Sequence, residues 1–276
     1  MPPLLSMGIR FTLAGLILLI FIRITKGSAE FSIPRPEIAS ASVLGFVTLG
    51  FGLGNVAVSS KHVPTGVVSL IIAALPLWIA LFRSVAREKI NKFTWLGTLV
   101  GFAGVVILLK PGSIESVSGV GSSTLFFYMF MVLIGNVGWA LGTYLAPRFP
   151  IPKNSLLFTG IEMLAGGVAL TFAAFIRGEK LSDFLDASST SWFWFFYLVF
   201  IGSITAYSAY LWLVMNAPVS LTATYAYVNP VIAVLLGVLF LNEKITVNYA
   251  LGGAIILLGV LTVVTSESNA KRLAKG

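Results

Sequence analysis

The sequence predicts an all-α polytopic membrane protein. Of its 276 residues, 57% are hydrophobic and only 10% are charged, and its mean hydropathy of +0.96 is far above that of ordinary soluble domains. The apolar stretches are continuous and do not alternate with polar residues at every second position, which favours membrane helices over barrel strands. The spacers between them are short, so none can hold a soluble domain.

Nine stretches are long enough to cross a bilayer, because a helix needs about 20 apolar residues to span a hydrocarbon core about 30 Å thick. They lie at residues 4–22, 39–59, 66–86, 93–110, 124–146, 155–176, 191–214, 219–240 and 248–266. The first stretch is too long for the apolar region of a signal peptide, and no small-residue cleavage pattern follows it. We expect it to be retained as a helix.

An internal repeat relates the two halves of the chain. PTGVVSLIIAALP recurs in form as PVSLTATYAYVNP, with Pro64 and Pro76 matching Pro218 and Pro230 at an offset of 154. After one inserted residue, the match continues at an offset of 155 through three further pairs: Glu88 with Glu243, Gly97 with Gly252 and Gly104 with Gly259. A fixed period of this kind indicates a duplicated structural unit.

The first stretch matches the sixth at an offset of 152. Gly8, Arg10 and Gly15 fall opposite Gly160, Glu162 and Gly167. The sixth stretch is preceded in its own half by a helix, 124–146, which has no counterpart in the first half. The sequence therefore predicts a ten-helix plan of two five-helix repeats, with nine helices present and helix one missing. The expected domains are 1–110, 124–266 and a basic cytoplasmic tail at 267–276.

The distribution of positive charge predicts the orientation. If the C-terminus is cytoplasmic, twelve Lys and Arg residues lie in cytoplasmic segments and five on the opposite face, which the positive-inside rule favours. The equivalent spacers AREKINK and LNEKITV then fall on opposite faces, so the repeats are inverted, as in many secondary transporters.

Composition also excludes several classes of function. The net charge of +8 lies mostly in short spacers, where it orients the chain, so we expect no nucleic-acid partner. There is no cysteine and only one histidine, His62, which excludes thiolate metal sites and a His-rich centre. No phosphate-binding G-x4-GK[ST] loop is present, so the chain has no ATPase motor of its own.

The doubled P-x11-P with a following Glu-Lys, the WALGTY stretch and the RF-x-LAG helix resemble the EamA family of the drug/metabolite transporter superfamily over the whole chain. Through GIEMLAGG and ATYAYVNPVIAVLLG the chain is most similar to bacterial inner-membrane transporters of that family. The resemblance implies a fold of ten helices in inverted repeats and export of small metabolites, amino acids or drugs. It also implies that helix one, which lines the central cavity in the family, is the missing one.

Arg10 and Glu162 are the first candidates for substrate binding, because an ionisable group inside a bilayer is costly unless it is paired or hydrated. As equivalent residues, they would face a cavity near the midplane, either paired or contacting the two charged ends of a zwitterion. The alternatives are snorkelling to the interface and a purely structural ion pair.

The helix at 219–240 offers a polar face made of Thr222, Tyr225 and Asn229, whose repeat partners are all apolar. This face suits a cavity wall, with Pro230 freeing carbonyls in the turn before it. Hydrogen bonding between helices is an equally good explanation.

Four further residues are candidates for binding a solute. Trp139 offers an aromatic wall, although aromatic residues near helix ends often act as interfacial anchors. Asn55, Asn136 and Tyr207 add polar groups. In contrast, Glu88 and Glu243 suit capping of the helix that follows each of them. The glycines near 97–101 and 252–253 suit close helix approach within the chain, and a homodimer face is the less favoured use.

The leading interpretation is a secondary transporter that exports a small organic solute by alternating access, driven by a proton or solute gradient. The alternatives are a flippase for a lipid-linked carrier and a truncated remnant that does not transport. An intramembrane enzyme is disfavoured, because the chain offers no recognisable set of nucleophile, base and metal ligands. No cofactor is expected.

Overall fold

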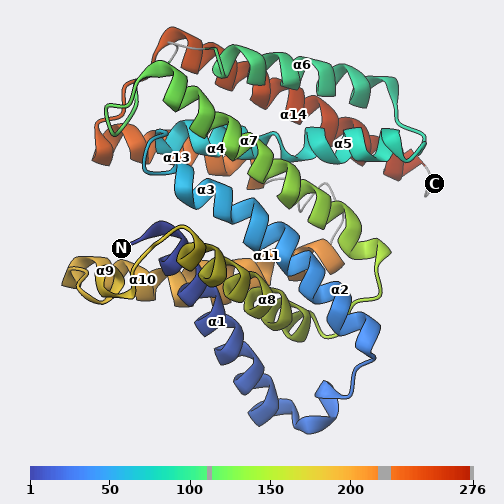
Figure 1. Ribbon diagram of the computed structural model, residues 1–276. Helices are drawn as coiled ribbons and strands as arrows, with labels where there is room; N and C mark the ends of the chain where they lie inside the picture. Colours follow the sequence, from blue (N-terminus) through green and yellow to red (C-terminus); the bar gives the residue numbers. More distant parts are fainter. Residues whose placement is uncertain (111–113, 217–224, 274–276) are drawn as a thin grey trace. The chain divides into compact units, whose positions relative to one another are not determined.

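The computed structural model describes residues 1–110, 114–216 and 225–273, with the side chains of 225–227 and 270–273 left undescribed (Figure 1). Every regular element in these ranges is helical. The elements are α1 (Pro3–Lys26), η1 (Ser28–Phe31), α2 (Arg35–Gly45), η2 (Phe46–Leu53), α3 (Gly54–Ser59), α4 (Thr65–Ala73), α5 (Leu75–Val85), α6 (Lys92–Leu108), α7 (Ser122–Leu145), η3 (Ala146–Arg148), α8 (Ser155–Ile176), α9 (Leu181–Leu185), α10 (Ser189–Tyr197), η4 (Leu198–Tyr207), α11 (Ser208–Asn216), α13 (Tyr225–Leu241) and α14 (Val247–Leu273).

The predicted all-α membrane class is confirmed. Among the described residues, seven helical segments are long and apolar enough to cross a membrane, and two shorter apolar helices, Lys92–Leu108 and Val228–Leu241, accompany them. The predicted helix at 66–86 is broken at Ala74 into α4 and α5. Pro76 lies in the first turn of α5, where its missing N–H costs no hydrogen bond. Pro230 lies inside α13, which continues through it.

The described chain forms two compact units. Unit 1 contains residues 1–57 and 142–217, and unit 2 contains residues 58–141 and 218–276. Each unit therefore combines segments from both halves of the sequence, and the boundaries of the units do not coincide with the predicted repeats.

Unit 1 is built around α1 and α8, which cross in antiparallel directions at glycines. A Cβ on Gly15 would lie 2.8 Å from the carbonyl oxygen of Gly160, and a Cβ on Gly167 would lie 2.8 Å from that of Gly8. Real Cβ contacts are not this short, so only glycine allows the two backbones to touch. The four glycines are those that the sequence match pairs between the halves.

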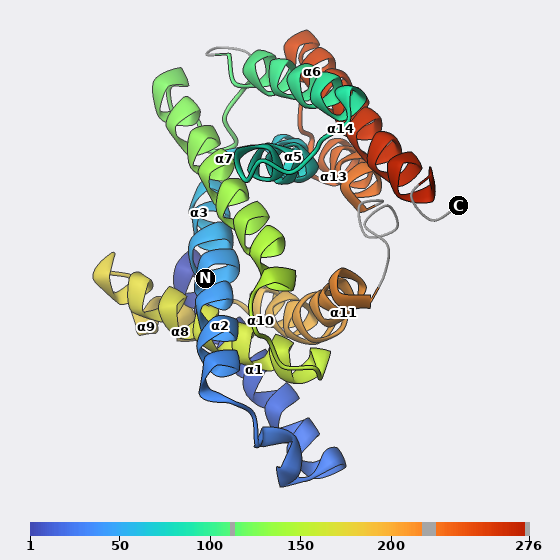
Figure 2. The ribbon, with the colours of Figure 1, turned by 90° about the vertical axis from the view of Figure 1, so that its right-hand side faces the viewer.

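Unit 2 repeats this arrangement with α6 and α14, which lie side by side in Figure 1 and again in Figure 2. A Cβ on Gly97 would lie 2.8 Å from the carbonyl oxygen of Gly259, and a Cβ on Gly104 would lie 2.9 Å from that of Gly252. In the repeat, Gly97 matches Gly252 and Gly104 matches Gly259, but in the structure Gly97 contacts Gly259 and Gly104 contacts Gly252. A two-fold relation between the halves requires this exchange. The predicted use of these glycines in close helix approach within the chain is confirmed.

Polar contacts tie the ends of the α1–α8 pair. The Glu179 carboxylate, which follows α8, accepts hydrogen bonds from the backbone N–H groups of Leu4 (3.3 Å) and Leu5 (2.8 Å) at the start of α1. At the other end, Asn154 caps α8 and donates a 2.8 Å hydrogen bond to Glu30, in the short helix after α1. These contacts satisfy backbone donors that a helix cannot pair internally.

Candidate functional site

A buried carboxyl group in unit 1 is the centre of the candidate site. Glu162 lies on α8 with only 1% of its surface exposed, and the hydroxyl of Tyr207 donates a 2.9 Å hydrogen bond to its Oε2. Gly45 on α2 makes room for this segment, because a Cβ there would lie 2.7 Å from the Cα of Glu162. Two predicted site residues are therefore brought into direct contact.

Two π-helical segments supply side chains next to this carboxyl group. Tyr207 is the last residue of η4, and Thr48, whose side chain contacts Tyr207, lies in η2. The Thr48 hydroxyl also donates a 2.7 Å hydrogen bond to the carbonyl of Leu44. π-Helical turns are rare and occur frequently at functional sites.

A second tyrosine extends the polar group along the same helix. The ring of Tyr210 stacks on that of Tyr207, with centroids 6.1 Å apart and an interplanar angle of 30°. Its hydroxyl lies 3.1 Å from the hydroxyl oxygen of Thr143 on α7. The two tyrosines are three residues apart and so share a helix face. The three-residue spacing of Tyr207 and Tyr210 is visible in the sequence and could have predicted this pair.

Arg10 lies on α1, and its guanidinium carbon is 4.4 Å from the centroid of the Phe11 ring. Phe11 is itself buried, and its ring centroid lies 6.4 Å from that of Tyr207. The Nε of Arg10 is buried without a hydrogen-bond partner, and no ion pair joins Arg10 to Glu162 in the part of the chain that the structure describes. The alternative of a structural ion pair between them is therefore wrong for this conformation. Phe11, which links the two groups, was not predicted as a site residue.

The remaining candidates are distributed over both units. In unit 1, Asn55 is half-buried and donates to the carbonyl of Phe51 on its own helix at 2.8 Å. In unit 2, Asn136 is buried and donates to the carbonyl of Ile71 at 2.8 Å, while its Oδ1 has no partner among the described residues. Trp139 is half-buried and Asn229 is exposed. Thr222 and the side chain of Tyr225 lie outside the described residues.

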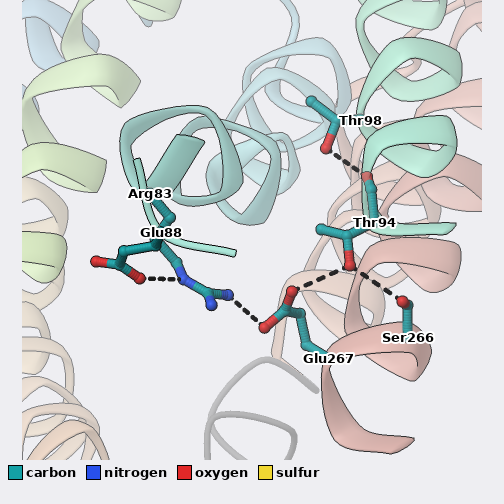
Figure 3. A network of polar contacts seen from close by, with 6 residues as sticks. All are labelled: Arg83, Glu88, Thr94, Thr98, Ser266 and Glu267. Atoms are coloured by element: carbon teal, nitrogen blue, oxygen red, sulfur yellow. Dashed lines mark hydrogen bonds and ion pairs between the residues drawn. The ribbon is translucent and has the colours of Figure 1, made fainter. Parts of the chain in front are cut away.

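A second polar network, which sequence reasoning missed, joins three helices of unit 2 (Figure 3). Arg83 on α5 bonds to Glu88 at 2.8 Å and also pairs with Glu267 on α14. Glu267 accepts a 3.0 Å hydrogen bond from Thr94 on α6. The spacing of these residues along the chain gives no signal of the contact, because Glu267 lies 173 positions after Thr94 and 184 after Arg83.

The predicted capping roles of Glu88 and Glu243 need correction. Asn91 caps α6, the helix after Glu88, and Thr246 accepts from the backbone of Tyr249 at the start of α14. Glu243 instead accepts hydrogen bonds from the N–H groups of Thr65 (2.6 Å) and Gly66 at the start of α4, far away in the sequence. A free helix N-terminus attracts any nearby carboxylate, wherever it lies in the chain.

The site contains the groups needed to bind a charged solute but not those of a metal centre. In the described ranges, no three His, Cys, Asp or Glu side chains are grouped as metal ligation would require. Glu162 offers a carboxyl group, Arg10 a guanidinium, and Phe11, Tyr207 and Tyr210 offer ring surfaces. These groups can hold opposite charges and an apolar portion of one small molecule.

Residues 1–110 and 126–265 match the EamA-like transporter family. The chain belongs to this family. This EamA-like chain is 35% identical over 237 residues to the uncharacterized inner membrane transporter YedA of Escherichia coli strain K12, across 86% of the chain and 73% of the relative. It is 26% identical over 276 residues to the uncharacterized transporter YvbV of Bacillus subtilis strain 168, across 99% of the chain and 86% of the relative.

One solved crystal structure has the same fold as the EamA-like chain. It aligns with a TM-score of 0.66 at 21% sequence identity, over 98% of this chain and 90% of the other. The relatives carry the names of transporters and not of enzymes. The EamA-like chain is therefore a multi-pass membrane protein of a transporter family.

Proposed function

We propose that this chain is a secondary transporter that exports a small organic solute, such as a metabolite, an amino acid or a drug, across the bacterial inner membrane by alternating access. The observation that carries the proposal is the buried Glu162 carboxyl group, held by Tyr207 inside a membrane-spanning helix of a transporter-family chain. Intramembrane ionisable groups of this kind mark substrate and ion pathways.

Arg10 and Glu162 are the groups that contact the solute in this proposal. Both lie on membrane helices of unit 1, and neither has an oppositely charged side chain as partner among the described residues. A buried charge without a partner is unfavourable, so a solute that brings an ammonium to Glu162 and a carboxylate to Arg10 is stabilised there. The aromatic rings of Phe11 and Tyr207 lie beside these groups and can cover the apolar portion of the solute.

Transport can be measured with purified protein in proteoliposomes. The solutes are radiolabelled amino acids and cationic drugs, each tested with and without a pH gradient, since either a proton or a solute gradient can drive a secondary transporter. We expect concentrative movement of at least one zwitterionic solute. Glu162→Gln keeps an acceptor for the Tyr207 hydroxyl but can neither ionise nor release a proton, so it is expected to abolish this movement.

The matched control is Glu115→Gln, which removes an exposed carboxylate that pairs with Lys244 at the surface. It is expected to transport as the wild type does. If Glu162→Gln transports every solute at the wild-type rate with and without the pH gradient, then Glu162 has no role in binding or coupling. If the wild type moves none of these amino acids and drugs under any gradient, the result contradicts the proposal.

The C-terminus is cytoplasmic in this proposal. The support is the excess of Lys and Arg in the segments that would then lie inside, such as the stretch from Arg83 to Lys92. A reporter that fluoresces only in the cytoplasm, fused after Gly276, is expected to be bright. A reporter that is dark there and active in the periplasm would reverse the assigned orientation and hence the direction of flux.

A further inference from the structure

Two π-helical segments occupy equivalent places in the two halves of the chain. At the offset of 152 that relates α1 to α8, Phe46 at the start of η2 falls opposite Leu198 at the start of η4, and Gly50 falls opposite Gly202. π-Helix makes up well under 1% of residues in ordinary proteins. Its occurrence at the same place in both halves indicates a built feature of the fold.

The side chains of η4 confirm the wider turn and show what it costs. The hydroxyl of Thr205 donates a 2.9 Å hydrogen bond to the carbonyl of Phe200, five residues earlier. The hydroxyl of Ser203 in η4 and that of Ser208, the first residue of α11, are buried and have no hydrogen-bond partner in the described part of the chain. In an α-helix, a serine hydroxyl can reach the carbonyl four residues earlier. Since buried polar groups without partners are unfavourable, contacts outside η4 must hold it in the π form.

One of these outside contacts is at the end of η4. Tyr207, the last residue of η4, donates its hydroxyl to the buried carboxyl group of Glu162 on α8, and Thr48 of η2 contacts the same tyrosine. A π-helical turn holds about one residue more than an α-helical turn, and the ten residues of η4 make about two turns. Converting all of η4 to α-helix therefore turns Tyr207 relative to Leu198 by roughly 160°. The tyrosine would then leave Glu162.

We propose that Tyr207 is the positioning residue for the Glu162 carboxyl group, and that η4 changes between π-helical and α-helical register as this carboxyl group is held or released. This inference rests on the proposed function, because release is what makes the carboxyl group available to a solute. In the π register, Tyr207 occupies Glu162. In the α register, Ser203 and Ser208 gain backbone partners, and Glu162 loses its phenol.

The chain contains no cysteine, so a spin label can be attached at one introduced cysteine without removing others. Ala209, which is exposed just after η4, is the reporter position, and Phe196, exposed just before η4, is the matched control. The measured quantity is the accessibility of each label to oxygen by electron paramagnetic resonance in lipid nanodiscs. This readout requires no transport and no known solute.

Tyr207→Phe removes the hydroxyl and keeps the ring. We expect it to lower the accessibility of the label at Ala209 relative to the label at Phe196 by about twofold or more, because a rotation of roughly 160° carries an exposed position toward the packed face. Glu162→Leu removes the acceptor from the other side and is expected to give the same change. It also covers the case in which Tyr207→Phe does not fold. Glu162→Gln keeps an acceptor and is expected to match the wild type.

An unchanged ratio between the two labels in both Tyr207→Phe and Glu162→Leu would overturn the inference, and the π-helical segment would then be a fixed structural feature. An equal change at both labels would also overturn it, since that result indicates general loosening of the helix. The register change can be present in a chain that transports nothing, and transport can occur with a fixed η4. Failure of this inference and failure of the proposed function are therefore distinguishable.

Discussion

The contact between α6 and α14 predicts that a single methyl group at Gly259 destabilises the protein. In Gly259→Ala, the new Cβ would lie 2.5 Å from the Cα of Gly101 and 2.7 Å from the carbonyl oxygen of Gly97. Ordinary van der Waals contact begins near 3.4 Å, so the two helices must move apart. Every one of these neighbours is a backbone atom, and no change of rotamer can relieve the overlap.

The expected loss of stability follows from two opposing effects. Overpacking a well-packed contact costs typically about 1–3 kcal/mol, and the separation also disturbs the neighbouring crossing of Gly104 and Gly252. Alanine recovers up to about 1 kcal/mol because it forms helix more readily than glycine. Taking the middle of the overpacking range, about 2 kcal/mol, the net loss is about 1–2 kcal/mol, which lowers the melting temperature by roughly 2–8 °C for a chain of this size.

The assay is thermal unfolding in detergent, followed by tryptophan fluorescence and by the fraction that stays monodisperse on size exclusion. Gly121→Ala is the matched control, because a Cβ at Gly121 has nothing within 4 Å and the residue does not have a positive φ. We expect the control to melt with the wild type. If Gly259→Ala melts at the same temperature as Gly121→Ala, the backbones of α6 and α14 are not in contact at this glycine.

Four further substitutions test the polar contacts of the two units. Arg83→Met deprives two carboxylates of their cation and is expected to cost about 1–3 kcal/mol, whereas Lys244→Met breaks an exposed pair and is expected to cost at most about 1 kcal/mol; chemical denaturation compares the two. Glu179→Ala removes the acceptor for two backbone N–H groups at the start of α1, so hydrogen exchange of the first turn should accelerate while that of α14 stays unchanged. Asn154→Ala removes the cap of α8 and should lower the unfolding free energy by about 1 kcal/mol, measured by the same denaturation assay.

The membrane class and the helical segments were predictable from sequence because they depend on length and composition alone. The repeat also located the glycines at both helix crossings, since close backbone contact leaves glycine as the only fitting residue. The break at Ala74 was not predicted. A proline is tolerated both in the first turn of a helix and, with a kink, inside one, so Pro76 and Pro230 have the same sequence pattern and different outcomes.

The members of the candidate site were easier to predict than their contacts. Glu162 was identifiable because an acid in an apolar helix is rare, and Tyr207 because it is polar. Their hydrogen bond joins residues 45 positions apart, and the direction of Tyr207 depends on the π-helical turn before it. A period of 3.6 residues assigns the wrong face to every residue beyond such a turn, and no residue type in η4 identifies it beforehand.

The repeat explains why Arg10 and Glu162 occupy equivalent positions without forming an ion pair. The contacts of Gly8 with Gly167 and of Gly15 with Gly160 fix the antiparallel register of α1 and α8. In this register, Ala165 falls opposite Arg10 and Leu13 falls opposite Glu162. Antiparallel helices place equivalent residues on opposite sides of the crossing, so the two charges are kept apart by the same symmetry that brings the glycines together. Arg10 and Glu162 therefore form no ion pair with each other at the crossing of α1 and α8.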